Sequence, residues 1–167
     1  AELDHESVGE HEVVVRVTDA EGATYDETLS ITVSDANEAP TEIQFAGGYV
    51  AENAEPGTYV GTATTSDQDA GDSHSYELVG DAEGRFTIDP DTGVVTVADG
   101  AELDHESASS HEITIRVTDA QGETYEETLE VSVTDVNEAP TEVAFAGGTV
   151  AENSAAGTVV GTVSVTD

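Results

Sequence analysis

The chain has no cysteine, methionine, tryptophan or lysine, and its only strongly basic residues are Arg16, Arg85 and Arg116. Without cysteine it can form neither disulfides nor thiolate metal sites, which excludes zinc-finger and thiol chemistry. Those arginines face 37 acidic residues, so the formal net charge is −34. Repulsion between like charges excludes nucleic acid and anionic membranes as partners. The same repulsion makes the fold depend on cations, high salt or both.

Long apolar runs and large side chains are also scarce. No segment approaches the roughly 20 consecutive apolar residues of a membrane span, so we expect no direct membrane insertion. Hydrophobic residues form 37% of the chain, yet only three Phe and five Tyr are present. A small core must therefore be built mainly from Val, Ile, Leu and Ala. The chain is nevertheless too apolar and too regularly patterned to be disordered.

Internal repetition is the dominant feature of the sequence. AELDHES begins at Ala1 and again at Ala101, and NEAPTE begins at Asn37 and again at Asn137. In that register 42 of the 67 comparable positions are identical, with no insertion or deletion. The period predicts the C-terminal part of one repeat, a complete repeat and the N-terminal part of the next, at 1–36, 37–136 and 137–167.

Short segments with alternating apolar residues indicate β-strands. HEVVVRV at His11 returns as HEITIRV at His111, where every second position stays apolar and Val14 becomes Thr114. This pattern is typical of a strand with one buried face. Seven strands are expected in the complete repeat, at 41–45, 58–65, 75–79, 85–88, 94–98, 112–118 and 125–133.

Turn chemistry separates these strands. The sequence DPDTG at 89–93 predicts a hairpin turn, and the pair Gly47 and Gly48 is expected to break the first strand into two. Seven short strands in about 100 residues predict an all-β fold of tandem seven-stranded antiparallel β-sandwiches with Greek-key connections. The expected interior residues are Ile43, Phe45, Val50, Val60, Leu78, Phe86, Ile88, Val95, Val97, Leu103, Ile113, Ile115, Val117, Leu129, Val131 and Val133.

Carboxylates and amides gather where one repeat gives way to the next. DANEAP at 35–40 recurs as DVNEAP at 135–140. Calcium prefers six to eight oxygen ligands from carboxylates, amides and backbone carbonyls, and each junction offers several of these within four residues. The proline cannot extend a strand ladder and helps to fix the crossing between repeats. The junctions are therefore predicted calcium sites.

These junctions and five further motifs, in order along the chain, resemble those of cadherin repeats. The junction resembles the family's D-x-N-D-N-x-P linker, and LDHE at 103–106 resembles its LDRE. The early glutamate motif, the DxD, the run before LDRE and the late aspartate motif are matched at 51–58, 67–69, 86–93 and 117–120. The resemblance covers the whole chain. It implies a cadherin/immunoglobulin-like sandwich with calcium ions clustered at each junction.

Carried over residue by residue, the resemblance implies that ligands from two repeats meet at each linker. For the first junction the implied ligands are Asp4 and Glu6, then Asp35, Asn37 and Glu38 from the linker, and Asp67, Asp69 and Asp119 from the following repeat. For the second junction they are Glu52, Asp104, Glu106, Asp135, Asn137 and Glu138. Asp167 is the first residue of the next DxD motif.

The sequence departs from the family pattern in two respects. The linker is one residue shorter, and Glu38 replaces the central aspartate, which leaves the number of ions at each junction open. His5 and His105 stand where the family has arginine, and we expect these side chains to point away from the ions.

Other candidate sites have ordinary structural explanations. The five histidines show no zinc spacing and are expected on the surface or at strand edges. Asp89 and Asp91 belong to a turn. The loop after Asp67 is not an EF-hand, because its sixth position is Asp72 and its twelfth is Leu78. The chain also lacks an aromatic-lined pair of carboxylates, a nucleophile elbow and a phosphate-binding loop, so we expect no enzyme.

The function expected from these observations is that of a spacer made rigid by calcium in an extracellular adhesin or filament. The resemblance and the acidity suggest a large bacterial or archaeal surface protein that supports attachment or cell–cell and biofilm cohesion. Its partners would be neighbouring repeats of the same chain, or like chains in a filament, with a cell-surface glycan or protein as a further partner. The alternative is a calcium-dependent carbohydrate-binding module, for which Tyr49 and Tyr59 are the nearest aromatic candidates.

The two partial repeats lack the strands equivalent to 68–100. Neither partial repeat can close a sandwich, and isolated pieces this small would not offset their chain entropy. We expect the missing strands to come from a longer periodic chain, or else from neighbouring molecules. Successive repeats would then be spaced by roughly 40 Å, since a ten-residue strand spans about 33 Å before the linker is added.

Overall fold

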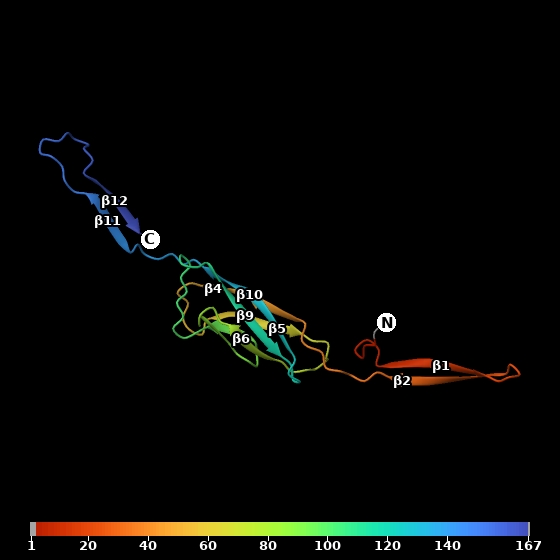
Figure 1. Ribbon diagram of the computed structural model, residues 1–167. Coiled ribbons are helices and arrows are strands. Elements are labelled where there is room, and N and C mark those ends of the chain that lie inside the picture. The colour runs from red at the N-terminus through yellow and green to blue at the C-terminus, as the bar shows by residue number, and fades with distance from the viewer. Residues whose placement is uncertain (1–2, 167) are drawn as a thin grey trace. The chain divides into compact units, whose positions relative to one another are not determined.

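The computed structural model describes residues 3–166, and its regular structure is entirely β (Figure 1). In the described residues no helix is long and apolar enough to cross a membrane. The strands are β1 (Glu10–Thr18), β2 (Thr24–Thr32), β3 (Glu42–Gly47), β4 (Tyr49–Ala51), β5 (Tyr59–Ser66), β6 (Ser75–Gly80), β7 (Phe86–Ile88), β8 (Val94–Val97), β9 (Ser110–Thr118), β10 (Thr124–Thr134), β11 (Glu142–Gly147) and β12 (Gly161–Thr166).

The strands β3 to β10 form a two-layer sandwich. One sheet has the order β4-β10-β9-β6 and the other has the order β3-β5-β8-β7. All pairings within the two sheets are antiparallel except that of β4 with β10, which run parallel with Val50 opposite Val133. The predicted sandwich class is confirmed, and the parallel pair is a feature that the expectation of a wholly antiparallel fold missed.

The parallel pair arises because the first strand changes sheets. Gly47 and Gly48 both have positive φ, at 118° and 82°, a backbone conformation that L side chains rarely adopt. A Cβ atom at Gly47 would lie 2.6 Å from the carbonyl oxygen of Val60. The predicted break at these glycines is therefore confirmed, and it transfers the chain from β3 in one layer to β4 in the other.

The core lies between the two sheets and consists of small aliphatic residues around Phe86. Its buried members are Ile43, Val50, Val60, Ala63, Phe86, Val95, Val97, Leu103, Ile113, Ile115, Val117, Val131 and Val133. All but Ala63 were expected from the alternating pattern. Four further expected residues, Phe45, Leu78, Ile88 and Leu129, are partly buried and pack against this cluster.

The remaining strands form two hairpins, β1 with β2 and β11 with β12. Val13, Val15 and Val17 on β1 are 38–62% exposed, whereas their equivalents in β9 are fully buried. The sequences are nearly the same, so the difference reflects the second sheet, which among residues 3–166 covers β9 and β10 but not β1 and β2. The chain divides into two compact units, of which the first ends at Thr134 and the second begins at Asp135. The repeat boundaries at 36/37 and 136/137 stay predictions.

Candidate metal centre

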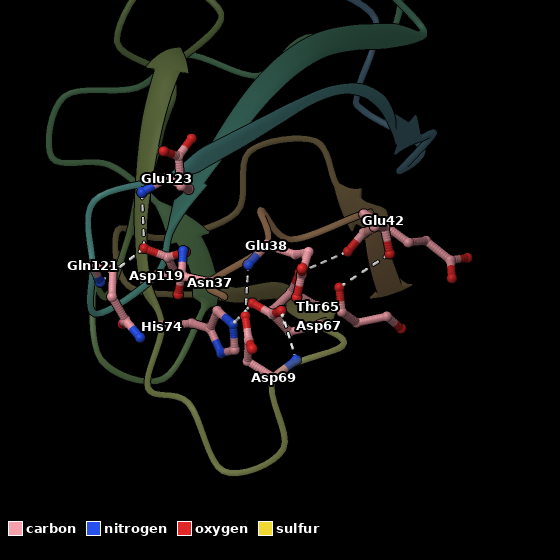
Figure 2. Close-up of polar contacts among 12 residues, drawn as sticks. Asn37, Glu38, Glu42, Thr65, Asp67, Asp69, His74, Asp119, Gln121 and Glu123 are labelled. Carbon is pink, nitrogen blue, oxygen red and sulfur yellow. Dashed lines mark hydrogen bonds and ion pairs between the residues drawn. The ribbon is translucent and has the colours of Figure 1, made fainter. Parts of the chain in front are cut away.

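The first linker, at 33–41, joins β2 to β3 and is fixed against two loops of the sandwich. The Asn37 side chain donates from Nδ2 to Oδ2 of Asp119, at 2.9 Å. The Glu38 backbone N–H donates to Oδ2 of Asp69, also at 2.9 Å, and Pro40 is buried. Figure 2 shows these contacts converging from the linker, the β5–β6 loop and the β9–β10 turn. The linker thus presents its polar side chains to carboxylates that follow it in sequence.

Asp119 directly follows β9 and is almost completely buried, with 6% of its surface exposed. Its Oδ1 atom accepts hydrogen bonds from the backbone N–H groups of Gln121, Gly122 and Glu123. Burial alone would raise the pKa of Asp119, but the hydrogen bonds from Asn37 and from these N–H groups hold it below its usual value. The carboxylate is therefore kept ionised in a position closed to water.

The β5–β6 loop supplies Asp67 and Asp69, both expected from the DxD motif. Asp69 donates its N–H to Oδ1 of Asp67 at 3.2 Å. Nε2 of His74 lies 2.8 Å from Oδ2 of Asp67, and the two side chains are only 16% and 4% exposed. The expectation that the histidines lie at the surface or at strand edges is wrong for His74, because the loop folds back and encloses it beside Asp67.

Four carboxylates, those of Glu6, Asp35, Glu38 and Asp69, form the first ligand group. One oxygen from each lies within 4.8 Å of the others. Burial raises the pKa of Glu38, and the negative charges of Asp69, Asp35, Asp4 and Asp67 raise it further. The group therefore concentrates negative charge that no arginine of the described residues neutralises.

A second ligand group consists of Asp67, Asp72 and Asp119, again with one oxygen of each within 4.8 Å of the others. Asp67 and Asp119 were expected, whereas Asp72 was not. The only signal for Asp72 in the sequence was its place three residues after the DxD motif. Whether Asp72 faces the junction depends on the conformation of the loop, which the spacing of residues in the sequence does not reveal.

Asp4 is held differently from the other expected ligands. Its carboxylate accepts hydrogen bonds from Ser7 Oγ at 2.7 Å and from the backbone N–H groups of Ser7 and Glu6. These bonds, led by that from the Ser7 hydroxyl, lower the pKa of Asp4. Asp104 repeats the arrangement with Ser107. Both aspartates close a turn, and in the described residues neither joins a ligand group.

His5 does not point away from the acidic cluster, contrary to the expectation from the family arginine. Its Nδ1 atom lies 2.8 Å from the carbonyl oxygen of Val33, and a ring nitrogen lies within 4.8 Å of carboxylate oxygens of Glu6 and Asp35. His105 makes the equivalent contact with Val133 at 2.7 Å. In both repeats this ring fastens the LDHE turn to the end of the last strand.

The oxygens of the first junction fit a hard cation. Asn37 Oδ1, Glu38 Oε2 and Asp72 Oδ2 are buried and have no hydrogen-bond partner among the described residues. A buried carboxylate oxygen without a partner carries a large desolvation cost, and it can be satisfied only by a donor or a cation. Calcium accepts carboxylate and amide oxygens at 2.3–2.6 Å, so oxygens up to about 5 Å apart can share one ion.

Glu52, an expected ligand of the second junction, is 3% exposed. Its carboxylate accepts the backbone N–H of His105 at 2.8 Å, and its own N–H donates to the carbonyl of Thr134. Glu52 is thereby held between the LDHE turn and the end of β10. The other expected residues of this junction, Glu106, Asp135, Asn137 and Glu138, stay predictions, and Asp167 lies outside the described residues.

The fold and the junction define a two-layer β-sandwich module with an acidic end whose oxygens fit a cation. A cadherin-domain model matches residues 47–134, more than half of the chain, and the chain belongs to the cadherin family. It is 31% identical to human Protocadherin Fat 1 over 169 residues, which is 95% of this chain and 4% of that protein. It is also 31% identical to chicken Cadherin-1 over 153 residues, 82% of this chain and 17% of that protein.

Solved structures give the same result. Extracellular cadherin domains 1–4 of Protocadherin Gamma B7 superpose with a TM-score of 0.71 and 26% identity, over 98% of this chain and 42% of that one. The extracellular domain of Protocadherin GammaB4 gives 0.69 and 32%, over 98% of this chain and 27% of that one. Cadherin domains are extracellular adhesion modules that bind calcium in general, and these relatives are adhesion proteins. The chain spans only a small part of each relative.

Proposed function

We propose that this chain is a spacer whose junctions become rigid when calcium binds. The observation that carries the proposal is the first junction, where the linker, the preceding LDHE turn and two loops of the sandwich all contribute oxygens. Glu6 comes from the preceding LDHE turn, and Asp67, Asp69 and Asp119 come from the loops of the sandwich. The linker itself contributes Asp35, Asn37 and Glu38. Bound calcium would supply the positive charge that these groups lack.

The mechanism follows from electrostatics. Several carboxylates within a few ångströms repel one another, so the free-energy minimum without a cation favours separation of the segments that carry them. When two segments share one ion, they can separate only by breaking coordination bonds to that ion. The bound ion therefore holds the linker in one conformation. By the repeat, Glu52, Glu106, Asp135, Asn137 and Glu138 would have the same role at the second junction. Asp4 and Asp104 would support the two LDHE turns that carry Glu6 and Glu106.

We further propose that the chain belongs to a large surface adhesin or filament of a bacterium or archaeon, although the relatives above are animal proteins. The support is the charge. The repeat at 37–136 has 23 acidic and two basic residues, more than calcium at one junction would neutralise. Such a surface stays soluble and folded in salty surroundings, because salt screens its repulsion. Neighbouring repeats, or like chains in a filament, would be its partners.

Spin-label distances test the spacer mechanism. Since the chain has no cysteine, cysteines introduced at Thr28 and Thr87, both exposed, can be labelled without background. We expect a narrow distance distribution with millimolar calcium and a broad one with chelator. A pair at Thr87 and Glu112, both within the sandwich, is the control and should not change. The proposal would be overturned if the Thr28–Thr87 distance distribution were equally wide with calcium and with chelator. It would also be overturned if calorimetry showed no calcium binding at millimolar concentration.

A second candidate function is calcium-dependent carbohydrate binding. It is favoured by Tyr49 and Tyr59, whose surfaces are 66% and 54% exposed, since exposed aromatic rings commonly stack on sugars. Against it, the next repeat has Thr149 and Val159 at these positions. Specific binding on a glycan array, lost in Tyr49→Ala, would place this function first.

A further inference from the structure

Asp72 lies in the β5–β6 loop, outside the motifs that predicted the junction. Its N–H donates to the carbonyl of Asp69 at 3.2 Å, which closes a turn. Gly71, inside that turn, has φ of +92° with open space where a Cβ would lie. The left-handed backbone at Gly71, rather than packing, thus sets the direction of the chain at Asp72. One Asp72 oxygen consequently lies within 4.8 Å of oxygens of Asp67 and Asp119.

The three carboxylates differ in how they are satisfied. Asp67 is bonded by Asp69 and His74, and Asp119 by Asn37 and three backbone N–H groups. Oδ2 of Asp72 is buried and has no hydrogen-bond partner within residues 3–166. That oxygen makes no contact that stabilises the loop. Its burial therefore carries a desolvation cost unless a further group binds to it.

No basic side chain is available to bind it. In the described part of the chain the arginines are engaged elsewhere: Arg16 with Asp26, Arg85 with Glu83, and Arg116 with Glu77 and Glu126. His74 is directed at Asp67. The amide oxygen of Asn37 is a second buried atom without a partner, on the side chain whose nitrogen bonds Asp119. Two buried acceptors beside one set of carboxylates favour the binding of a cation from solution.

We propose that Asp72 is a calcium ligand in its own right, giving the Asp67–Asp119 subsite a third carboxylate. The inference rests on the proposed calcium binding at this junction and adds a residue to it. Ligand charge is one of the factors that set calcium affinity. A subsite with three carboxylates binds calcium more tightly than one with two, and it favours trivalent lanthanides further.

The test is Asp72→Asn in the 167-residue chain, since asparagine keeps the size of the side chain and one oxygen. The matched control is Glu123→Gln, which removes one charge from an exposed residue of the neighbouring β9–β10 turn. Calcium calorimetry and tyrosine-sensitised terbium luminescence report binding. Loss of groups that merely support ligands already weakens metal binding about 10–100-fold, so Asp72→Asn should weaken calcium and terbium binding at the Asp67–Asp119 subsite at least about tenfold. Glu123→Gln should change it little.

Melting temperatures provide a second readout. In chelator Asp72→Asn should melt higher than the natural chain, because repulsion is relieved, and in calcium it should gain less than the natural chain. A merely structural role would lower both temperatures. Unchanged affinity in Asp72→Asn, or equal losses in Asp72→Asn and Glu123→Gln, would overturn the assignment of Asp72. Absence of calcium binding by the natural chain would instead overturn the proposed function itself.

Discussion

His111, on β9, is a partly buried residue whose charge state is coupled to folding. Its ring meets that of Phe86 edge-on, with centroids 6.2 Å apart. Burial lowers its pKa, and the positive charge of Arg85 lowers it further, while Glu83 acts in the opposite direction. The folded protein therefore binds a proton at His111 less readily than the unfolded chain does. The free energy of unfolding should fall as pH drops below about 6.5, the unperturbed value.

Substitution of His111 by phenylalanine should remove this dependence while keeping an aromatic ring against Phe86. We expect the natural chain to lose more stability than His111→Phe between pH 7.5 and pH 5, measured by urea unfolding at a fixed calcium concentration. Other titrating groups contribute equally to both proteins and cancel in the difference. Equal losses would show that His111 protonates without penalty in the folded state.

At the same scale, several residues show what the sequence could and could not reveal. Ile113, Ile115 and Val117 were expected in the core because alternation along a strand is a local property. His74 and Asp72 were missed because their roles depend on how one loop folds back. The same holds for Glu127, whose carboxylate accepts the N–H of Ile43 from the other layer, at 3.1 Å. Such contacts join residues far apart in sequence, and no local pattern encodes them.

Among the elements, the β3–β4 crossing carries the strictest requirement for glycine. Gly47→Ala would place a Cβ at φ 118°, 2.6 Å from the Val60 carbonyl oxygen and 2.8 Å from Gly61 Cα. Backbone strain of this kind costs about 1–3 kcal/mol, and the clash adds to it. We expect a loss of about 3 kcal/mol or more in urea unfolding. Gly100→Ala, with φ 77° and no neighbour within 4 Å, is the control and should cost about 1 kcal/mol.

The two copies of one hairpin provide an internal comparison at the element scale. β1–β2 and β9–β10 share backbone pairing and most of their sequence, yet within the described residues only β9–β10 is covered by a second sheet. A two-stranded hairpin is marginal alone, whereas a core strand opens only with the domain. The amide of Ile115 should exchange with deuterium about a hundredfold or more slowly than that of Val15. Equal protection would mean that another surface covers β1–β2 in solution.

Most strands of the complete repeat could be predicted from the sequence, and the exception is the short strand β4 with its pairing to β10. Strand positions in the complete repeat agree with expectation to within a few residues, since each follows from alternation and a turn signal. The pairing of β4 with β10 could not be read from the sequence. Only three residues, Tyr49, Val50 and Ala51, form β4, and their partner strand lies some 80 positions away. Parallel pairing over that distance is set by tertiary packing.

For the molecule as a whole, charge decides the conditions of stability. With three arginines, all in ion pairs with carboxylates, the chain cannot neutralise its own acidic surface. Removal of calcium by chelator should lower the melting temperature, and magnesium should restore little, because it demands shorter bonds and strict octahedral geometry. Added sodium chloride should restore part of the loss by screening. Identical melting curves in calcium and in chelator would contradict this account.

The parallel pairing of β4 with β10 has a mechanical consequence. β4 lies near the start of the sandwich and β10 at its end, with Ser132, Val133 and Thr134 beside Tyr49, Val50 and Ala51. When tension pulls the chain from both sides, two parallel neighbours of this kind slide along each other. Their interstrand bonds then share the load and must break together, whereas in a hairpin pulled open at its end they break one after another. The short strand β4, which Gly47 and Gly48 place beside β10, should therefore raise the force needed to stretch the sandwich open.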